Sequence, residues 1–413
     1  MAEAWTNWAG SVACRPRYLE TPGSEAELVE RVKKAADEQL TVRVTGSGHS
    51  FTPLCASDGM LISLDRLYGV VSTDPAALEA TVWAGTKIWQ MGEPLWQAGL
   101  AMANMGDIDR QNLAGAISTG THGTGRDLGS ISTQMVGLRL VTAAGELVDC
   151  SAETEPELFK AGQVSLGALG VISQVRLRLL PAYRLHEKSW AMPVEECLAG
   201  LEALIAANRH FEFFWSPKED ACAAKALNPV AAGSGEIAGD GVEALAGSPS
   251  PPGSLARYLK PERADHSYRI FPSERTIRFN EIEFALPEVN GPDCFREIRR
   301  LMQRHYPEVT WPVEYRTLAA DDIDLSPAYG RASVTLSVHQ AHDRPYERFF
   351  ADVEAIFRSY GGRPHWGKIH RHKARQLRPL YPRWNQFQAV RARLDPQGRF
   401  MNAHLRSLFD ETD

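Results

Sequence analysis

The spacing of apolar residues along the chain predicts a mixture of helices and strands. Residues 24–36 carry apolar side chains at helical spacing, and Ser24 with Glu27 forms a capping-box pattern at their start. Val42 and Val44 then alternate with polar residues, as in a strand that enters a glycine turn. The same spacings predict further helices at 88–97, 155–160, 294–305 and 346–360, and strands at 60–64, 80–84, 136–141, 146–149, 173–180, 279–286 and 334–339. Such a pattern is typical of an α/β protein.

A change in composition at Pro181 divides the chain. A length of 413 residues exceeds what one hydrophobic core organises, so two domains are expected. Trp, Phe, Glu and Pro become more frequent after Pro181, which we take as the boundary between a domain of residues 1–181 and a domain of residues 182–393. Gly, Ser and Pro dominate residues 229–253, which predicts a flexible insert.

Composition and charge exclude several classes of function. Hydrophobic and charged fractions of 44% and 23% are typical of a globular enzyme. A net charge of −6 without any basic block argues against a nucleic-acid partner. The six cysteines are scattered without a C-x-x-C pair, which indicates reduced thiols and no metal site. The start of the chain resembles no secretion signal, and no apolar run approaches the ~20 residues of a membrane span, so a cytoplasmic protein with no membrane partner is expected.

Two glycine-rich runs are the first candidates for binding chemistry. In residues 42–50, V-R-V-T-G-S-G-H-S, Gly46 and Gly48 can take positive φ, so that backbone N–H groups close around an anion such as a pyrophosphate. The spacing matches neither the P-loop nor the G-x-G-x-x-G pattern. Residues 114–125, A-G-A-I-S-T-G-T-H-G-T-G, form the second run. Two such loops supply two sets of donors for one long anionic ligand.

These two motifs resemble those of the vanillyl-alcohol-oxidase-type FAD flavoproteins. The first loop of that family reads G-[GS]-G-H-S and the second reads A-G-x-I-x-x-G-T-H-G-x-G. The chain is most similar to the sugar-lactone oxidase group, which acts on L-gulono-1,4-lactone or D-arabinono-1,4-lactone, with the alditol oxidases close by. The resemblance implies an α+β fold. It consists of a two-subdomain FAD-binding domain of the PCMH type and a mixed α/β substrate cap, and the tail at about 394–413 returns to the FAD domain.

The resemblance also implies how FAD is held. Family members with this first loop carry the 8α-methyl of FAD on the histidine, so a covalent link through His49 is expected. Residues 100–113 contain no cysteine, so a second, cysteinyl link is not expected. His122 has either a structural role in its loop or a cofactor contact. The implied FAD contacts are Val44, Thr45, Gly46, Ser47, Gly48, His49, Ser50, Gly106, Asp107, Asn112, Gly115, Thr119, Gly120, Thr121, His122, Gly125 and Ile172.

Glu314 and Arg316 are candidates for the substrate site. In a strand, residues two apart share a face, so both side chains would project into one cavity. A surface ion pair is the alternative, but the preceding W-P-V at 311–313 indicates an interior segment. The lactone and alditol oxidases carry the same E-x-R in their substrate pocket.

The most specific string is R-P-H-W-G-K-I-H at residues 363–370. By resemblance Lys368 is a fixed cation at the flavin N1–C2=O edge, where negative charge develops on reduction. His370 follows the lactone oxidases, and a packing role is its alternative. Asp107, also a candidate catalytic residue, and His339 both depart from the alditol oxidases. Gly106 occupies the place where a small residue in this superfamily leaves O₂ a path to the flavin.

The activity implied is the oxidation of a sugar-derived alcohol. For an aldono-1,4-lactone, hydride passes from the C2–H to flavin N5, and O₂ reoxidises the flavin to give hydrogen peroxide. The alternatives are an alditol oxidase acting on the terminal CH₂OH of xylitol or sorbitol, and an aldonolactone dehydrogenase with another acceptor. A flavin-storage or sugar-binding module is the non-enzymatic alternative.

Overall fold

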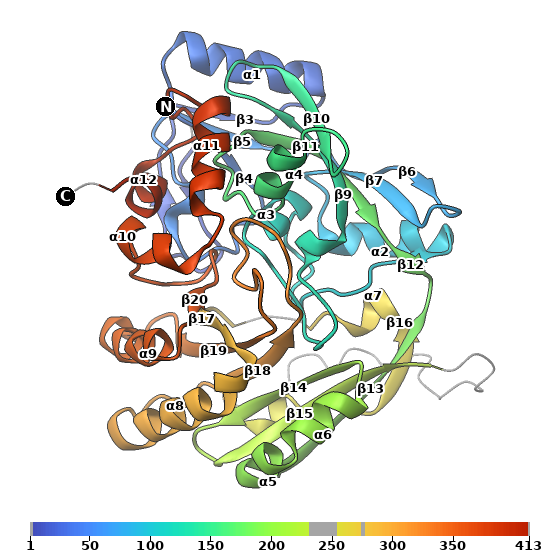
Figure 1. The fold of residues 1–413 in the computed structure, drawn as a ribbon, viewed down its shortest axis with the longest axis vertical. Helices are drawn as coiled ribbons and strands as arrows, with labels where there is room; N and C mark the ends of the chain where they lie inside the picture. Colours follow the sequence, from blue (N-terminus) through green and yellow to red (C-terminus); the bar gives the residue numbers. More distant parts are fainter. Residues whose placement is uncertain (1–2, 231–253, 274–276, 412–413) are drawn as a thin grey trace.

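The computed structural model describes residues 3–230, 254–273 and 277–411. Three main sheets form its framework, and the last helices return to the N-terminal end of the molecule (Figure 1). Antiparallel pairing dominates the two larger sheets, so the fold is α+β, as the family resemblance implied. The insert predicted for 229–253 lies, from residue 231 on, outside the described residues.

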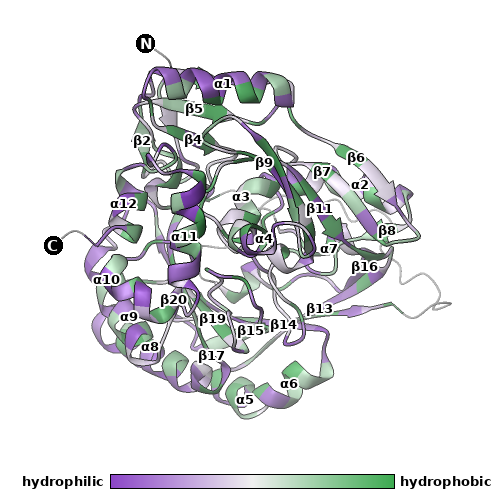
Figure 2. Ribbon diagram, turned by 45° about the horizontal axis from the view of Figure 1, so that its top comes forward, coloured by the Kyte–Doolittle hydropathy of each residue, from purple (hydrophilic) through white to green (hydrophobic). Residues whose placement is uncertain are grey.

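A small parallel sheet opens the fold. Its strand order is β3 (Tyr18–Glu20), β5 (Met60–Ser63), β4 (Val42–Thr45), and α1 (Glu25–Asp37) connects β3 to β4. The hydroxyl of Ser24 accepts a hydrogen bond from the Glu27 N–H at 3.1 Å, so the predicted helix start is confirmed. Figure 2 shows hydrophobic residues concentrated on β4, β5 and β9, whereas the ribbon of α1 alternates hydrophobic and hydrophilic residues. Two short strands, β1 (Trp5–Thr6) and β2 (Ala13–Cys14), pair with each other before this sheet.

A five-stranded antiparallel sheet follows. Its order is β10 (Leu147–Ser151), β9 (Met135–Val141), β11 (Val171–Arg178), β7 (Glu79–Trp83), β6 (Val70–Asp74). The helices of this part are α2 (Ile88–Gln97), α3 (Leu113–Ser118) and α4 (Pro156–Gln163), and β8 (Leu100–Ala101) pairs with β12 (Leu180–Pro181). Short 3-10 turns are η1 (Pro53–Cys55) and η2 (Ile131–Gln134). The predicted hairpin at 136–149 is confirmed as β9 and β10.

An eight-stranded sheet forms the other half. Its order is β16 (Arg263–His266), β13 (Arg184–Pro193), β15 (Ala221–Pro229), β14 (His210–Ser216), β18 (Val313–Leu318), β19 (Ser333–Ala341), β17 (Phe279–Pro287), β20 (Arg363–Pro364). Its helices are α5 (Val194–Ala199), α6 (Leu201–Ala207), α7 (Ser267–Ile270), α8 (Gly291–His305) and α9 (Glu347–Ser359), with 3-10 turns η3 (Leu255–Arg257) and η4 (Glu288–Asn290). Of these, α5, α6, α8 and α9 pack on one face of the sheet, away from the glycine loops (Figure 1).

The alternation along β17 and β18 separates an apolar face from a polar one. Phe284 of β17 and Val313 and Tyr315 of β18 belong to a buried cluster with α8 and α9. The intervening residues, Glu283 of β17 and Glu314 of β18, project from the opposite face. That polar face lies against the part of the chain that carries the glycine loops.

The C-terminal helices pack with the N-terminal part. They are α10 (Ala374–Leu377), α11 (Trp384–Leu394) and α12 (Ala403–Phe409), with η5 (Arg378–Leu380) between the first two. Buried side chains from Trp366 onward belong to the core of the N-terminal part, so the return begins earlier than the predicted residue 394. The aromatic residues of α11 give an apolar stripe, and periodicity alone does not say which core such a stripe joins. No helix in the described ranges is long and apolar enough to cross a membrane.

Candidate active site

The two glycine loops lie against each other. Ser47 of the first loop donates a hydrogen bond to Asn112 Oδ1 at 2.9 Å, just ahead of α3 in the second run. A Cβ on Gly46 would lie 2.6 Å from that same Oδ1, so only glycine permits this approach. Gly48 adopts φ +70°, and a Cβ there would lie 3.2 Å from the Asn7 backbone. The close packing of the two loops therefore explains Gly46, whereas the positive φ and the nearby N-terminal segment explain Gly48.

A cavity runs between the loops, and we call it the loop cavity. Among the described residues that line it, Arg43 carries a permanent charge and none is acidic. Backbone N–H groups and hydroxyls suit the two phosphates of FAD, and carboxylates would repel them. The predicted FAD contacts that line it are Val44, Thr45, Gly46, Ser47, Gly48, His49, Ser50, Asn112, Gly115, Thr119 and Ile172.

A second cavity lies between the loops and the eight-stranded sheet, and we call it the sheet cavity. Four predicted cofactor contacts line this cavity rather than the loop cavity: Gly106, Asp107, Thr121 and His122. His49, Ser50, Gln111 and Thr119 line both, so the two cavities adjoin. An elongated ligand in the loop cavity would therefore present one end to the sheet cavity.

Two predicted cofactor contacts lie elsewhere. Gly125 lines neither cavity, and its N–H donates to the Thr317 carbonyl at 3.0 Å, which joins the second run to β18. Gly120 borders a smaller cavity on the far side of His122. The family resemblance implied that both glycines lie beside the cofactor. The tertiary structure turns the end of that run toward the sheet.

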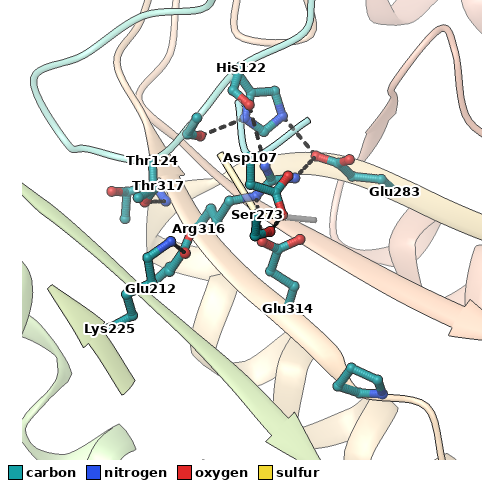
Figure 3. A network of polar contacts seen from close by, with 12 residues as sticks. Asp107, His122, Thr124, Glu212, Lys225, Ser273, Glu283, Glu314, Arg316 and Thr317 are labelled. Atoms are coloured by element: carbon teal, nitrogen blue, oxygen red, sulfur yellow. Dashed lines mark hydrogen bonds and ion pairs between the residues drawn. The ribbon is translucent and has the colours of Figure 1, made fainter. Parts of the chain in front are cut away.

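Glu314 and Arg316 share the sheet cavity, as the alternation of β18 predicted (Figure 3). The Nε of Arg316 lies 3.5 Å from Oε1 of Glu314, and both side chains are buried. Burial raises the pKa of Glu314 to about 8, and Arg316 only partly offsets this effect. Burial also acts to lower the pKa of Arg316, but Glu314 and Glu283 outweigh it, so Arg316 stays charged. The pair thus combines a carboxyl that titrates near neutral pH with a permanent cation.

The sheet cavity also contains three further residues that the sequence predicted for the site: Lys368, Asp107 and His49. Lys368 Nζ lies 2.5 Å from Oε2 of Glu281, and Ser273 Oγ donates to Asp107 Oδ2 at 3.3 Å. Burial, helped by Lys368, lowers the pKa of His49 to about 4, so its ring is neutral at pH 7. A neutral imidazole at the junction of the two cavities is a competent nucleophile.

His370 lines neither cavity, although the sequence motif made it a catalytic candidate. Its ring lies near Trp366 and His372, with ring centroids 6.2 and 6.1 Å away. Burial lowers its pKa well below the ordinary value, as do neighbouring histidines. The turn of this segment lies at residues 365–368, where the Lys368 N–H donates to the His365 carbonyl oxygen at 3.0 Å, and His370 beyond it packs near Trp366 and His372 instead of lining the cavity.

Sequence reasoning missed Glu281 and Glu283 of β17 and His365. All three are buried and line the sheet cavity. The string F-N-E-I-E-F-A-L contained a usable signal, because two acidic residues at alternating positions in an otherwise apolar strand must share one face and find partners there. Glu283 Oε1 accepts hydrogen bonds from Arg316 Nη2 at 3.1 Å and is 2.7 Å from His122 Nε2.

The sequence matches two family models. The model described as FAD binding domain matches residues 16–151, and the model described as D-arabinono-1,4-lactone oxidase matches residues 175–240 and 253–408. The N-terminal part therefore contains an FAD-binding domain, and the second match covers most of the eight-stranded sheet and its helices.

Full-length relatives agree with these matches. An L-gulono-1,4-lactone dehydrogenase of Mycobacterium tuberculosis is 37% identical, covering 98% of this chain and 99% of the relative. An L-gulonolactone oxidase of Mus musculus is 30% identical, covering 98% and 97%. Among solved structures, cholesterol oxidase from B. sterolicum superposes with a TM-score of 0.84 at 17% identity, covering 98% and 96% of the two chains, which is a likeness of fold.

Proposed function

The chain belongs to the D-arabinono-1,4-lactone oxidase family, and from this premise we propose that it is an FAD-dependent oxidase of aldono-1,4-lactones, of the L-gulono-1,4-lactone type. One observation carries the proposal for this chain. His49 and Thr119 line both cavities, so the reactive end of a flavin in the loop cavity would meet Glu314 and Arg316 in the sheet cavity. The division into an FAD-binding domain, residues 1–181, and a substrate cap from residue 182 is part of the proposal.

The residues of the sheet cavity have separate tasks in this reaction. Bound FAD supplies a hydride acceptor for the C2–H of the lactone and passes the electrons to O₂, which yields hydrogen peroxide. Oε1 of Glu314 accepts no hydrogen bond from the described residues, so it is available to take the proton of the C2 hydroxyl. Arg316 stabilises negative charge on that oxygen, and Asp107 binds a further hydroxyl. Lys368 offsets the charge that develops on the reduced flavin.

We further propose that His49 carries FAD covalently through the 8α position. The support is chemical, because burial keeps the ring neutral and the residue stands where the two cavities meet. An ionised carboxylate at this junction would raise the pKa of His49 and favour the protonated ring, which is not a nucleophile. The described residues that raise or lower the pKa of His49 are instead two cations, Lys368 and Lys87.

O₂ as the acceptor is a proposal that rests on Gly106. The two relatives differ in this respect by name, one being a dehydrogenase and the other an oxidase. Gly106 lines the sheet cavity, and a Cβ there would lie 3.2 Å from the His122 carbonyl oxygen. A side chain at this position would thus narrow the wall of the sheet cavity, and we propose that O₂ approaches the site past Gly106.

A substrate panel with two readouts tests the proposal. The flavin-loaded protein is supplied with L-gulono-1,4-lactone, D-arabinono-1,4-lactone, xylitol and sorbitol, and peroxide formation is compared with reduction of an artificial dye. A lactone with the highest kcat/KM and stoichiometric peroxide is the expected result. Faster turnover of a polyol than of every lactone would show an alditol oxidase instead. Dye reduction without peroxide would show a dehydrogenase, and no flavin bleaching with any compound under anaerobic conditions would leave a binding module.

A further inference from the structure

Strand β17 places two buried carboxylates, Glu281 and Glu283, on the wall of the sheet cavity. The two residues are 3% and 1% exposed, and the reaction described above assigns neither of them a task. An ionised carboxylate at such depth is costly unless cations hold it. Glu281 is held by Lys368 and Glu283 is held by Arg316.

Glu281 is paired with Lys368. Its Oε2 accepts from Lys368 Nζ at 2.5 Å, and His339 Nε2 lies 3.7 Å from its other oxygen. Burial acts to raise the pKa of Glu281, but Lys368 and His339 outweigh it and leave the pKa below the ordinary value. A lysine side chain has four rotatable bonds, so this contact selects one direction for the ammonium among many.

Glu283 is paired with Arg316 and His122 instead (Figure 3). His122 Nδ1 lies 2.8 Å from the Gly123 carbonyl oxygen, which can only accept, and Nε2 lies 2.7 Å from Glu283. Each ring nitrogen of His122 thus contacts an oxygen atom, which fixes the orientation of the ring. Arg316 Nη1 also donates to the His122 carbonyl oxygen at 3.3 Å, so the guanidinium is held at two points.

The sheet register makes these separate pairings possible. Strand β19 lies between β17 and β18, and its Ser337 is the direct neighbour of both Glu283 and Glu314. Arg316 is opposite Thr335, two residues from Ser337 on β19, and its guanidinium crosses β19 diagonally past these two small side chains to Glu283, two strands away. Glu281 is opposite His339, farther along, and is out of that row. The strand thus directs one carboxylate to each cation.

We propose that Glu281 and Glu283 are positioning residues with distinct partners: Glu281 fixes Lys368 against the flavin, and Glu283 with His122 fixes Arg316 against the substrate oxygen. This inference rests on the proposed function. The two carboxylates are neighbours on one face of β17 and are both buried. Loss of Glu281 should nevertheless affect the flavin, whereas loss of Glu283 should affect the substrate.

Glu281→Gln and Glu283→Gln form a matched pair for the test. Sulfite adds reversibly to flavin N5 and leaves negative charge at the N1–C2=O edge, so its dissociation constant reports a cation placed there without any turnover. Glu281→Gln is expected to weaken sulfite binding about tenfold, since one charge-assisted contact orders Lys368. Glu283→Gln is expected to leave sulfite binding within about twofold of wild type while lowering kcat/KM for the lactone by about tenfold or more.

Other changes in sulfite binding and in kcat/KM would overturn the inference. If Glu281 acted only as a negative charge, its removal would tighten sulfite binding, and if it had no role, binding would be unchanged. For Glu283, the test is a double variant. If Glu283→Gln lowers kcat/KM by the same factor in the Arg316→Lys variant as in the wild-type protein, Glu283 does not act through Arg316. Should a Gln variant fail to retain flavin, the Asp variant, which keeps the charge and shortens the reach, replaces it in the same measurements.

Failure of the inference is distinguishable from failure of the proposed function. Absence of lactone turnover by the wild-type protein would refute the function, and the sulfite comparison would remain measurable. Normal wild-type turnover with identical behaviour of the two Gln variants would refute the positioning roles alone.

Discussion

The Nε of Arg316 lies 3.5 Å from Oε1 of Glu314, yet burial outweighs this cation and raises the pKa of Glu314 to about 8. The carboxyl is therefore protonated below that pH and ionised above it. Only the ionised form can accept the hydroxyl proton of the substrate. The ionisation of Glu314 should therefore determine how the activity depends on pH.

We expect kcat/KM to rise with pH and to reach half its maximum near pH 8, the value to which burial raises the pKa of Glu314. Initial rates from about pH 6 to about pH 9.5 measure this profile. Glu314→Gln should lower kcat by about 10²–10⁴-fold and abolish the rise, because an amide accepts no proton. A flat profile in the wild-type protein would exclude Glu314 as the proton acceptor.

His49→Ala is expected to give a protein whose flavin is released on acid precipitation. The alanine side chain has no ring nitrogen that can bond to the 8α position, and the flavin would be held by contacts in the loop cavity alone. The measurement is the absorbance of the supernatant and of the washed pellet. His122→Ala is the control, and its pellet should stay yellow. Yellow colour in the His49→Ala pellet would contradict the covalent link.

Gly106→Ala is expected to slow reoxidation by O₂ while anaerobic reduction by the lactone stays near the wild-type rate. The added Cβ would lie 3.2 Å from the His122 carbonyl oxygen and 3.3 Å from Thr121 Cγ2, so it fills the space beside the site. Stopped-flow spectroscopy separates the two half-reactions. Gly200→Ala, at the junction of α5 and α6 in the cap, serves as the control. Equal oxygen reactivity of Gly106→Ala and wild type would remove the argument for an oxygen path.

Arg43→Met is expected to destabilise the protein by at least about 3 kcal/mol. The guanidinium is buried and donates to the carbonyl oxygens of Leu54, Leu166, Gly167 and Phe400, which come from three distant segments. Methionine would leave these acceptors buried without donors. Denaturant unfolding without added flavin measures the change, since flavin binding would itself shift stability.

Arg17→Met is the matched control for that variant. Arg17 forms an ion pair with Glu38 at 3.2 Å, but its side chain is 57% exposed. An exposed pair of this kind contributes about 0–1 kcal/mol. Equal destabilisation by both variants would mean that Arg43 does not join the C-terminal segment to the core.

Much of the candidate site followed from local patterns. The alternation of a strand places Glu314 and Arg316 on one face whatever surrounds them, and the structure has both in the sheet cavity. The glycines of the first loop indicated a close backbone approach, and Gly46 lies against Asn112. The helix start at Ser24 was equally local, because its hydroxyl bonds to an N–H three residues away.

Other relationships depended on contacts between distant segments. His122 and Glu283 are separated by 161 positions and meet only because the second glycine run packs on the polar face of the sheet. His370 lines neither cavity and Gly125 bonds to β18, although the family resemblance put both in the site. The sequence by itself determined which residues share a face, since strand and helix periods act over a few residues. Only the tertiary structure decided which faces meet, because that choice depends on long-range packing and on how buried charges find their partners.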